Sequence, residues 1–303
     1  MNCFATIITA DYFFYAKTII DALVTYDKNI RLQVLVVGDV PESTQYENVK
    51  IHTLKEIATC FQDDYETIKH YEIDAASTLR WALKPLFLKY LLLQEGFSKA
   101  VLIDPDIYFY NSPLFLFDYL EDVDVLITPH WRSKDPKKDA SNFNELFTGG
   151  LYNAGFFACN ASAINILDWW LAACAYKMEK TGGFYVDQSY LNLLPIYFSN
   201  QVKVLQHRGC NVANWNLIEC ERTNNTGEVL INDTYPIVFI HLTNSTINGI
   251  NRGVDSLLKP HLEHYKKALV KHNPSFKFTF ETYANTTQNV KSFRERIKNL
   301  LKF

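Results

Sequence analysis

The sequence lacks the cysteine spacings that mark metal-binding or redox sites, since its six cysteines form no Cys-x-x-Cys pair. A chain of 303 residues, 48% of them hydrophobic, can bury a large core without disulfides, so we expect free thiols and a cytoplasmic location. The amino-terminal segment has no basic stretch ahead of its apolar residues and soon reaches Asp11. It is therefore predicted to be a first strand and not a signal peptide.

Uninterrupted apolar runs of membrane-spanning length are also missing. The longest apolar segment, residues 156–176, contains Asn160, Asn165 and Asp168, which predicts a buried strand and helix and not a membrane span. The net charge of −3 argues against a general nucleic-acid-binding protein. No internal repeat or low-complexity linker divides the chain, so we expect one large α/β domain.

The charge is unevenly distributed along the chain. Residues 259–303 contain ten Lys or Arg against three Glu, a net charge of +7, which leaves −10 on residues 1–258. We therefore predict a domain over 1–258 and a basic helical tail over 259–303. Within the tail, residues 288–303 place apolar side chains on one helical face, with Lys and Arg elsewhere. Two interpretations remain open, peripheral contact with an anionic membrane at its inner face or packing of the apolar face on the domain.

The order of apolar segments predicts an α/β fold with a mainly parallel sheet. A strand over residues 3–9, a helix over 12–25 and a strand over 31–39 form an opening β-α-β unit. In such sheets the ligand lies at the carboxyl ends of the strands. The polar segment 131–147 is predicted to be a surface loop over the sheet that can act as a lid. The remaining elements are a helix over 75–95 kinked by Pro85, strands over 100–103, 124–128, 151–159, 202–205 and 237–242, and a helix over 160–178.

Two aspartates interrupt the apolar sequence directly after the strand over residues 100–103. Asp104 and Asp106 flank Pro105, and neighbouring carboxylates repel each other and resist burial unless something compensates their charge. A divalent cation is one candidate, because hard metal ions take carboxylate oxygens and bridge to phosphates. The other interpretation is a solvated loop in which the aspartates act as turn or cap residues. The metal ion is favoured because the carboxyl end of the first strand, at Thr9, is expected at the same edge of the sheet, where ligands bind.

Further polar motifs lie near expected strand ends and helix starts. They are TADY (9–12), NAGF (153–156), Asp187-Gln188 after a Gly-Gly turn, and GCNVANWN (209–216). Structural interpretations exist for three of them, because Thr9, Asp11 or Asp187 can cap a helix and residues 209–216 can form a polar loop around a buried Trp. Lys84 can belong to a solvated helix face, and His241, at the end of a buried strand, can be structural.

The order of these motifs resembles that of metal-dependent GT-A glycosyltransferases. The order is an apolar strand that ends in Asp-x-Asp, then NAGF, then Asp-Gln, and then a late His. The most similar subgroup is glycosyltransferase family 8 with its bacterial relatives, over about residues 1–250. The resemblance implies a GT-A-like (Rossmann-like) sheet, mixed and mainly parallel, flanked by helices. It also implies transfer of a hexose from a nucleotide-sugar donor, expected to be a UDP-sugar, to a glycan, lipid-linked or protein acceptor.

The resemblance assigns roles to the motif residues. Asp104, Asp106 and His241 would bind Mn²⁺ or Mg²⁺. Asp187 would bind hydroxyls of the donor sugar, and Gln188 would lie near its anomeric carbon. The donor-binding residues would be Thr9, Ala10, Asp11, Tyr12, Lys84, Asp104, Asn153 and Gly155. Contacts with the sugar or acceptor would come from Asn211, Trp215 and Asn244.

The resemblance also bears on stereochemistry. No Asp or Glu stands out as the base that an inverting enzyme needs to deprotonate its acceptor. Retaining members of the family use the departing phosphate itself, so we expect retention of the anomeric configuration. The chain departs from the family in the loop at residues 9–12, which lacks the usual extra acidic and amide residues.

Two alternative functions share part of this pattern. A non-catalytic nucleotide-sugar-binding module would keep the fold, but the intact set of Asp104, Asp106 and His241 favours an enzyme. Phosphatases of the haloacid dehalogenase type also place Asp-x-Asp after an apolar strand. Here Tyr108 stands where their motif has Thr or Val, and no later Gly-Asp-x-x-x-Asp motif follows.

Overall fold

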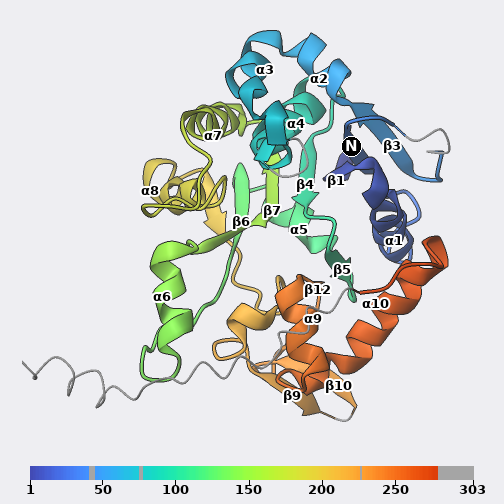
Figure 1. Cartoon of the computed structure of the whole chain (residues 1–303), viewed down its shortest axis with the longest axis vertical. Coiled ribbons are helices and arrows are strands. Elements are labelled where there is room, and N and C mark those ends of the chain that lie inside the picture. Colours follow the sequence, from blue (N-terminus) through green and yellow to red (C-terminus); the bar gives the residue numbers. More distant parts are fainter. Residues whose placement is uncertain (41–44, 75–77, 226, 279–303) are drawn as a thin grey trace, which may run out of the picture.

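The computed structural model describes residues 1–40, 45–74, 78–225 and 227–278 (Figure 1). Its central sheet consists of β1 (Asn2–Thr9), β2 (Leu32–Val37), β3 (Val49–Thr53), β4 (Lys99–Ile103), β6 (Val125–Pro129), β7 (Tyr152–Asn160) and β8 (Val202–Val204). The strand order is β3-β2-β1-β4-β7-β6-β8. Strand β7 runs antiparallel to both of its neighbours, and the other pairs run parallel. The predicted mixed, mainly parallel sheet is confirmed.

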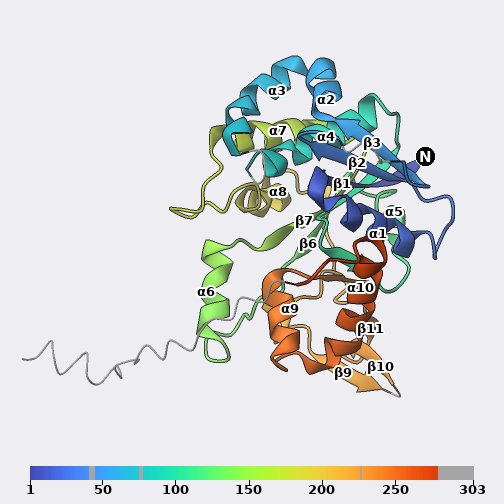
Figure 2. The ribbon, with the colours of Figure 1, turned by 45° about the vertical axis from the view of Figure 1, so that its right-hand side comes forward.

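Helices cover both faces of this sheet, which explains why its strands are apolar on both sides (Figures 1 and 2). On one face, α4 (Arg80–Leu93) and α7 (Ile164–Tyr176) pack against alternate residues of β1 such as Ala5. On the other face, α1 (Phe13–Leu23) and α5 (Phe115–Tyr119) pack against the residues between them, such as Phe4. The other α-helices that the structure describes before the carboxyl-terminal part are α2 (Leu54–Cys60), α3 (Gln62–Ile68), α6 (Ala140–Thr148) and α8 (Leu194–Tyr197). Short 3₁₀ helices form over Ala10–Tyr12, Lys69–Asp74, Ser189–Leu193, Asn214–Asn216 and Ser256–Leu258.

The strand predicted over residues 237–242 does not join the central sheet. It forms as β12 (Phe239–His241), which pairs antiparallel with β5 (Ile107–Phe109) in a separate two-stranded sheet. The pairing sets His241 opposite Ile107. The expected sheet membership was wrong because an apolar strand sequence does not encode its partner. Its partner is β5, which follows β4 after residues 104–106.

The segment 131–147 was predicted to be a surface loop, and this prediction is wrong in part. The segment contains most of α6 (Ala140–Thr148). The Asp139 carboxylate accepts the backbone N–H of Asn142 at 2.9 Å and caps this helix. A three-stranded antiparallel sheet was not predicted at all. It comprises β9 (Arg222–Asn225), β10 (Glu228–Ile231) and β11 (Tyr235–Pro236).

The carboxyl-terminal part of the description contains α9 (Asn244–Asn251) and α10 (Lys259–His272). Helix α10 buries Tyr265 and Leu269 and packs against α1. The amphipathic segment 288–303 lies outside the described residues, so its two interpretations, and the division of the chain after residue 258, stay predictions. No helix in the described ranges is long and apolar enough to cross a membrane.

A buried arginine shapes the loop between β8 and β9. Arg222 pairs with Asp255 (Nε to Oδ2, 3.0 Å), and their side chains are only 2% and 6% exposed. Its guanidinium also donates to the carbonyl of Ala213 at 2.7 Å and to Oδ1 of Asn216 at 3.1 Å. Arg222 therefore fixes the turn that carries Trp215.

Replacing Asp255 with Ala should destabilise the protein strongly. The substitution leaves the Arg222 guanidinium buried without its countercharge, which costs about 3 kcal/mol or more. Urea denaturation measures the loss. The matched control is Glu263→Ala, which removes an exposed ion pair with Lys266 and should cost less than about 1 kcal/mol. Equal losses in the two variants would contradict an anchoring role for the Arg222–Asp255 pair.

Candidate active site

Three possible metal ligands converge at one point of the fold. Asp104 follows β4, Asp106 precedes β5, and His241 ends β12. One potential ligand atom from each lies within 4.8 Å of the other two. The antiparallel pairing of β12 with β5 brings His241 to the two aspartates, and the backbone N–H of Leu242 donates to the carbonyl of Asp106 at 2.8 Å. We call these three residues the metal-ligand group.

The second aspartate and the histidine form an ion pair within this group. Nε2 of His241 lies 3.0 Å from Oδ1 of Asp106. Burial opposes protonation of His241, but the Asp106 carboxylate outweighs it and raises the pKa of the imidazole. Burial likewise opposes ionisation of Asp106, and His241 outweighs it so that the pKa of Asp106 is lowered. Each residue therefore stabilises the charge of the other.

A buried lysine compensates the neighbouring carboxylates. Lys84, on α4, is 4% exposed, and its Nζ lies 3.0 Å from Asp104 and 3.2 Å from Asp187. The same ammonium donates to the carbonyl of Ala154 at 2.8 Å. Burial disfavours the charged ammonium, but the two carboxylates outweigh it and raise the pKa of Lys84. The alternative of a solvated helix face is therefore wrong for Lys84.

Asp187 sits deeper than the other carboxylates of the site. It is 3% exposed, and burial raises its pKa to about 6, opposed by Lys84 and reinforced by Asp104. The adjacent Gln188 is held at both ends of its amide. Its Oε1 accepts the N–H of Ala154 at 3.1 Å, and its Nε2 donates to the carbonyl of Gly149 at 2.5 Å. Gln188 is thus fixed against the start of β7, and the Asp187 carboxylate faces Lys84.

The glycine of NAGF is required by its neighbours. A Cβ atom on Gly155 would lie 2.5 Å from Cε1 of His241, 2.6 Å from Oδ1 of Asn153 and 2.9 Å from Oδ2 of Asp104. Only a residue without a side chain lets these groups approach. Two carboxylates and one imidazole also form a donor set suited to Mn²⁺ or Mg²⁺. The residues present therefore fit a divalent metal ion.

A histidine that the sequence analysis missed orients Asn153. Nδ2 of Asn153 donates to Nε2 of His130 at 3.1 Å, and Nδ1 of His130 lies 3.0 Å from the carbonyl of Gly150. Burial, together with the charge of Arg132, lowers the pKa of His130 to about 3. The ring is therefore neutral, with its proton on Nδ1. No motif marked His130, because its partners are more than ten residues away along the chain.

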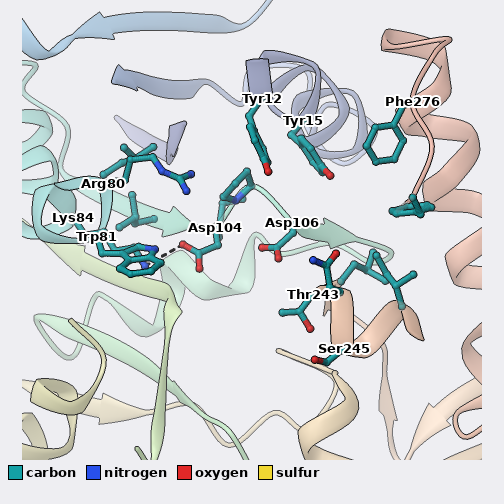
Figure 3. A pocket seen from close by; sticks show the side chains of 18 of the residues that line it. Tyr12, Tyr15, Arg80, Trp81, Lys84, Asp104, Asp106, Thr243, Ser245 and Phe276 are labelled. Atoms are coloured by element: carbon teal, nitrogen blue, oxygen red, sulfur yellow. Dashed lines mark ion pairs between the residues drawn. The ribbon is translucent and has the colours of Figure 1, made fainter. Parts of the chain in front are cut away.

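One cleft opens on the aromatic side of the metal-ligand group and has a volume of about 710 Å³ (Figure 3). We call it the first cleft. The rings of Tyr12 and Tyr15 stack there with centroids 5.2 Å apart and planes at 16°. The ammonium of Lys180 lies 5.1 Å from the ring centroids of both Trp81 and Tyr185. The aromatic and cationic lining residues are Tyr12, Tyr15, Arg80, Trp81, Lys84, Lys180, Tyr185, Phe276, Lys277 and Phe278.

Only some of the residues predicted to bind the donor or acceptor line the first cleft. Tyr12 and Asn244 line it. The hydroxyl of Thr9 donates to the Asp11 carboxylate at 2.5 Å, and neither of these residues nor Ala10 lines the first cleft. Most other lining residues were not predicted, because the lining comes from six separate segments of the chain, namely 7–15, 80–84, 102–106, 180–185, 242–247 and 276–278. The high aromatic content was the one signal that pointed toward them.

A second cleft, also of about 710 Å³, opens on the other side of the metal-ligand group. We call it the second cleft. Its predicted lining residues are Lys84, Asp104, Asp106, Asn153, Gly155, Asp187, Gln188, Trp215 and His241. The ring of Trp215 meets that of His241 edge-on, with centroids 5.3 Å apart. Asp104 and Asp106 line both clefts, so the metal-ligand group stands at their junction.

One predicted contact residue lies elsewhere. Asn211 is 0% exposed and lines neither cleft. Its backbone has a positive φ of 61°, and its amide reaches the carbonyl of Pro129 at 3.4 Å. Direct contact between Asn211 and a sugar is therefore contradicted by its burial. Its polarity in the sequence reflects the left-handed turn that it forms, which Asn tolerates better than most residues.

The sequence matches no protein-family model. The uncharacterized protein YfnF of Bacillus subtilis (strain 168) is 23% identical over 261 residues, which is 82% of this chain and 84% of that protein.

Several solved structures are similar in fold. The galactosyltransferase LgtC, in complex with donor and acceptor sugar analogs, has a TM-score of 0.54 and 16% identity, covering 89% of this chain and 96% of its own. An active-site mutant of LgtC, with glutamine replaced by glutamate, has a TM-score of 0.52 and 16% identity over 84% and 94% of the two chains. Mouse xyloside xylosyltransferase 1 in its apo form has a TM-score of 0.50 and 12% identity over 81% and 99%. At these identities the likeness shows a shared fold.

Replacing Gly155 with Ala should weaken metal binding without unfolding the protein. The added methyl group would push His241 and Asp104 apart, and we expect Mn²⁺ to bind about tenfold or more weakly. Isothermal titration with MnCl₂ measures the change. Gly249→Ala is the control, because a Cβ there meets nothing within 4 Å. Unchanged Mn²⁺ affinity in Gly155→Ala would show that the metal-ligand group does not bind the ion.

Proposed function

Because the chain has the fold of GT-A glycosyltransferases, we propose that it transfers a hexose from a nucleotide-sugar, with UDP as the expected nucleotide, to a glycan, lipid-linked or protein acceptor. We further propose that the reaction depends on Mn²⁺ or Mg²⁺ and retains the anomeric configuration. The observation that carries this proposal is the metal-ligand group of Asp104, Asp106 and His241 at the junction of two clefts.

The lining residues of the two clefts support different ligands for them, the nucleotide in the first cleft and the sugars in the second. The first cleft combines aromatic rings with Arg80, Lys84 and Lys180, which suits the base and the diphosphate of a nucleotide. The second cleft combines carboxylates, amides and the ring of Trp215, which suits sugar hydroxyls and sugar faces. The reacting bond would then lie near the metal-ligand group, where the clefts meet. The similar LgtC structure was solved with sugar analogs of a donor and an acceptor.

The reaction breaks the bond between the anomeric carbon and the diphosphate oxygen and forms a bond to an acceptor oxygen. When bound, a divalent cation supplies positive charge to the diphosphate leaving group. Lys84 adds a fixed positive charge beside Asp104, and Lys180 lines both clefts. In a retaining reaction the proton of the acceptor hydroxyl passes to the departing phosphate, so no protein base is required. Asp187 and Gln188 would position the donor sugar in the second cleft.

Asp104→Asn and Asp106→Asn should each abolish release of UDP from a panel of UDP-hexoses with Mn²⁺. Each change removes one charged ligand, and the side chains are 29% and 34% exposed, so the fold should survive. The assay measures UDP, and proton NMR of the product reads its anomeric configuration. Asp168→Asn, at an exposed ion pair with Lys89, is the control and should stay active.

Two further measurements, binding of a UDP-hexose and release of inorganic phosphate, separate the alternatives. Wild-type protein that binds a UDP-hexose in the presence of Mn²⁺ without releasing UDP would be a binding module. Release of inorganic phosphate from a phosphate monoester would indicate a phosphatase. Full Mn²⁺-dependent activity of Asp104→Asn would contradict the proposed role of the metal-ligand group.

Gln188→Ala should lower turnover more than donor affinity. Loss of the amide frees the N–H of Ala154 and the carbonyl of Gly149, beside the proposed position of the reacting carbon. We expect kcat to fall about tenfold or more, with KM for the donor changed much less. Steady-state kinetics measures both. Asn192→Ala is the control, since it removes a similar amide contact with the N–H of Leu151. Equal effects of the two variants would make Gln188 a structural residue only.

A further inference from the structure

A third cavity continues the second cleft away from the metal-ligand group. It has a volume of about 470 Å³, and we call it the distal pocket. It shares with the second cleft the lining residues Asp139, Asn142, Asn214, Trp215 and Ser245. Ser245 also lines the first cleft, and Figure 3 shows it below Asp106 beside Thr243. A continuous path therefore leads from the metal-ligand group past Trp215 into the distal pocket.

Hydrogen bonds tie the walls of this path together. Nδ2 of Asn142, on α6, donates to the carbonyl of Trp215 at 3.0 Å. The backbone N–H of Asn214 donates to the hydroxyl of Thr246 at 3.2 Å, and this hydroxyl donates to Oδ1 of Asn214 at 3.1 Å. The turn that carries Asn214 and Trp215 is thereby joined to α6 on one side and to α9 on the other. Arg222 also holds this turn, through its bond to the carbonyl of Ala213. The path is shaped before any ligand binds, which lowers the ordering cost of binding.

The lining of the distal pocket is mostly neutral. It joins amide side chains and apolar side chains to a single Asp and a single Arg. Among residues 1–278 that are described, no hydrogen bond or ion pair engages the side chains of Asn248 and Arg252. The indole Nε1 of Trp215 is buried and also has no partner among these residues. Unengaged donors, one amide, one indole and one guanidinium, beside apolar surface match the hydroxyl groups and C–H faces of sugars.

We propose that the acceptor is an oligosaccharide, with its reacting end in the second cleft and its following sugar units in the distal pocket. This inference rests on the proposed function. The pocket volume falls within the range of ligand sites, about 300–1,000 Å³, so the pocket can bury a substantial part of a ligand. An acceptor that presents a single sugar or a side-chain hydroxyl would leave this surface unused. Asn248 and Arg252, one helical turn apart on and after α9, would contact the distal units.

Filling the pocket tests the proposal. A Cβ on Gly249 meets nothing within 4 Å, and Leu is a better helix former than Gly, so Gly249→Leu should fold and obstruct the pocket. The control is Asn251→Leu, an exposed position of α9 that does not line the pocket. An array of mono- to tetrasaccharides, with a UDP-hexose and Mn²⁺, identifies an accepted terminal sugar. Its methyl glycoside and its di-, tri- and tetrasaccharides then serve as acceptors.

In wild-type protein, kcat/KM should rise about tenfold or more from the methyl glycoside to the longer acceptors, because remote binding energy contributes to the transition state. Gly249→Leu should remove this rise, whereas Asn251→Leu should keep it. Hydrolysis of the UDP-hexose without acceptor should be equal in all three proteins. This last readout shows that the donor site is intact.

The outcomes that overturn the proposal are distinct. Intact hydrolysis with no length dependence in wild type, or with the same length dependence in Gly249→Leu, would refute the distal pocket as an acceptor site. Hydrolysis without transfer to any member of the array would refute the oligosaccharide assignment. Wild-type protein that neither hydrolyses nor transfers would refute the proposed function, and this inference would fall with it.

Discussion

The ammonium of Lys84 lies between two carboxylates and a carbonyl group, and the rest of the site depends on that contact. Charges about 4 Å apart interact by about 4 kcal/mol where the effective dielectric constant is near 20, against less than about 1 kcal/mol for a typical exposed pair. If Lys84 were absent, the carboxylates of Asp104 and Asp187 would repel each other where little water screens them. The same ammonium ties α4 to the start of β7, through its hydrogen bond to the carbonyl of Ala154. It therefore joins the charge balance of the site to the packing of the domain.

The antiparallel strand β7 makes this arrangement possible. Because it is inserted between β4 and β6, its NAGF segment lies beside the end of β4, where Asp104 begins. Gly155 then offers the one position at which His241, Asn153 and Asp104 approach without a side chain between them. A small second sheet supplies His241 from a distant part of the chain. The site is thus assembled from the central sheet, one covering helix and a separate antiparallel pair of strands that are far apart in the sequence.

The two clefts differ in chemistry because different elements wall them. Stacked tyrosines from the start of α1 and Phe276, beyond α10, surround the first cleft (Figure 3). Helix α6 and the loop around Trp215 surround the second cleft and the distal pocket. Phe276 belongs to the segment that the charge distribution assigned to a separate tail. Its position in the first cleft means that at least the start of this segment is part of the site.

Local sequence determined most of the central sheet and the chemistry of the site. Runs such as residues 3–9 and 100–103 are apolar on both faces because helices cover both sides, and this pattern is visible without a structure. Asp104 and Asp106 were recognisable because paired carboxylates after a buried strand need compensation. Only the tertiary structure decided which groups provide it. The resemblance to glycosyltransferases pointed to His241 and Lys84, but their ion pairs with Asp106, Asp104 and Asp187 arise from strand pairing and helix packing over long sequence separations. No local pattern encodes such contacts, and none marked His130, the neutral ring that orients Asn153.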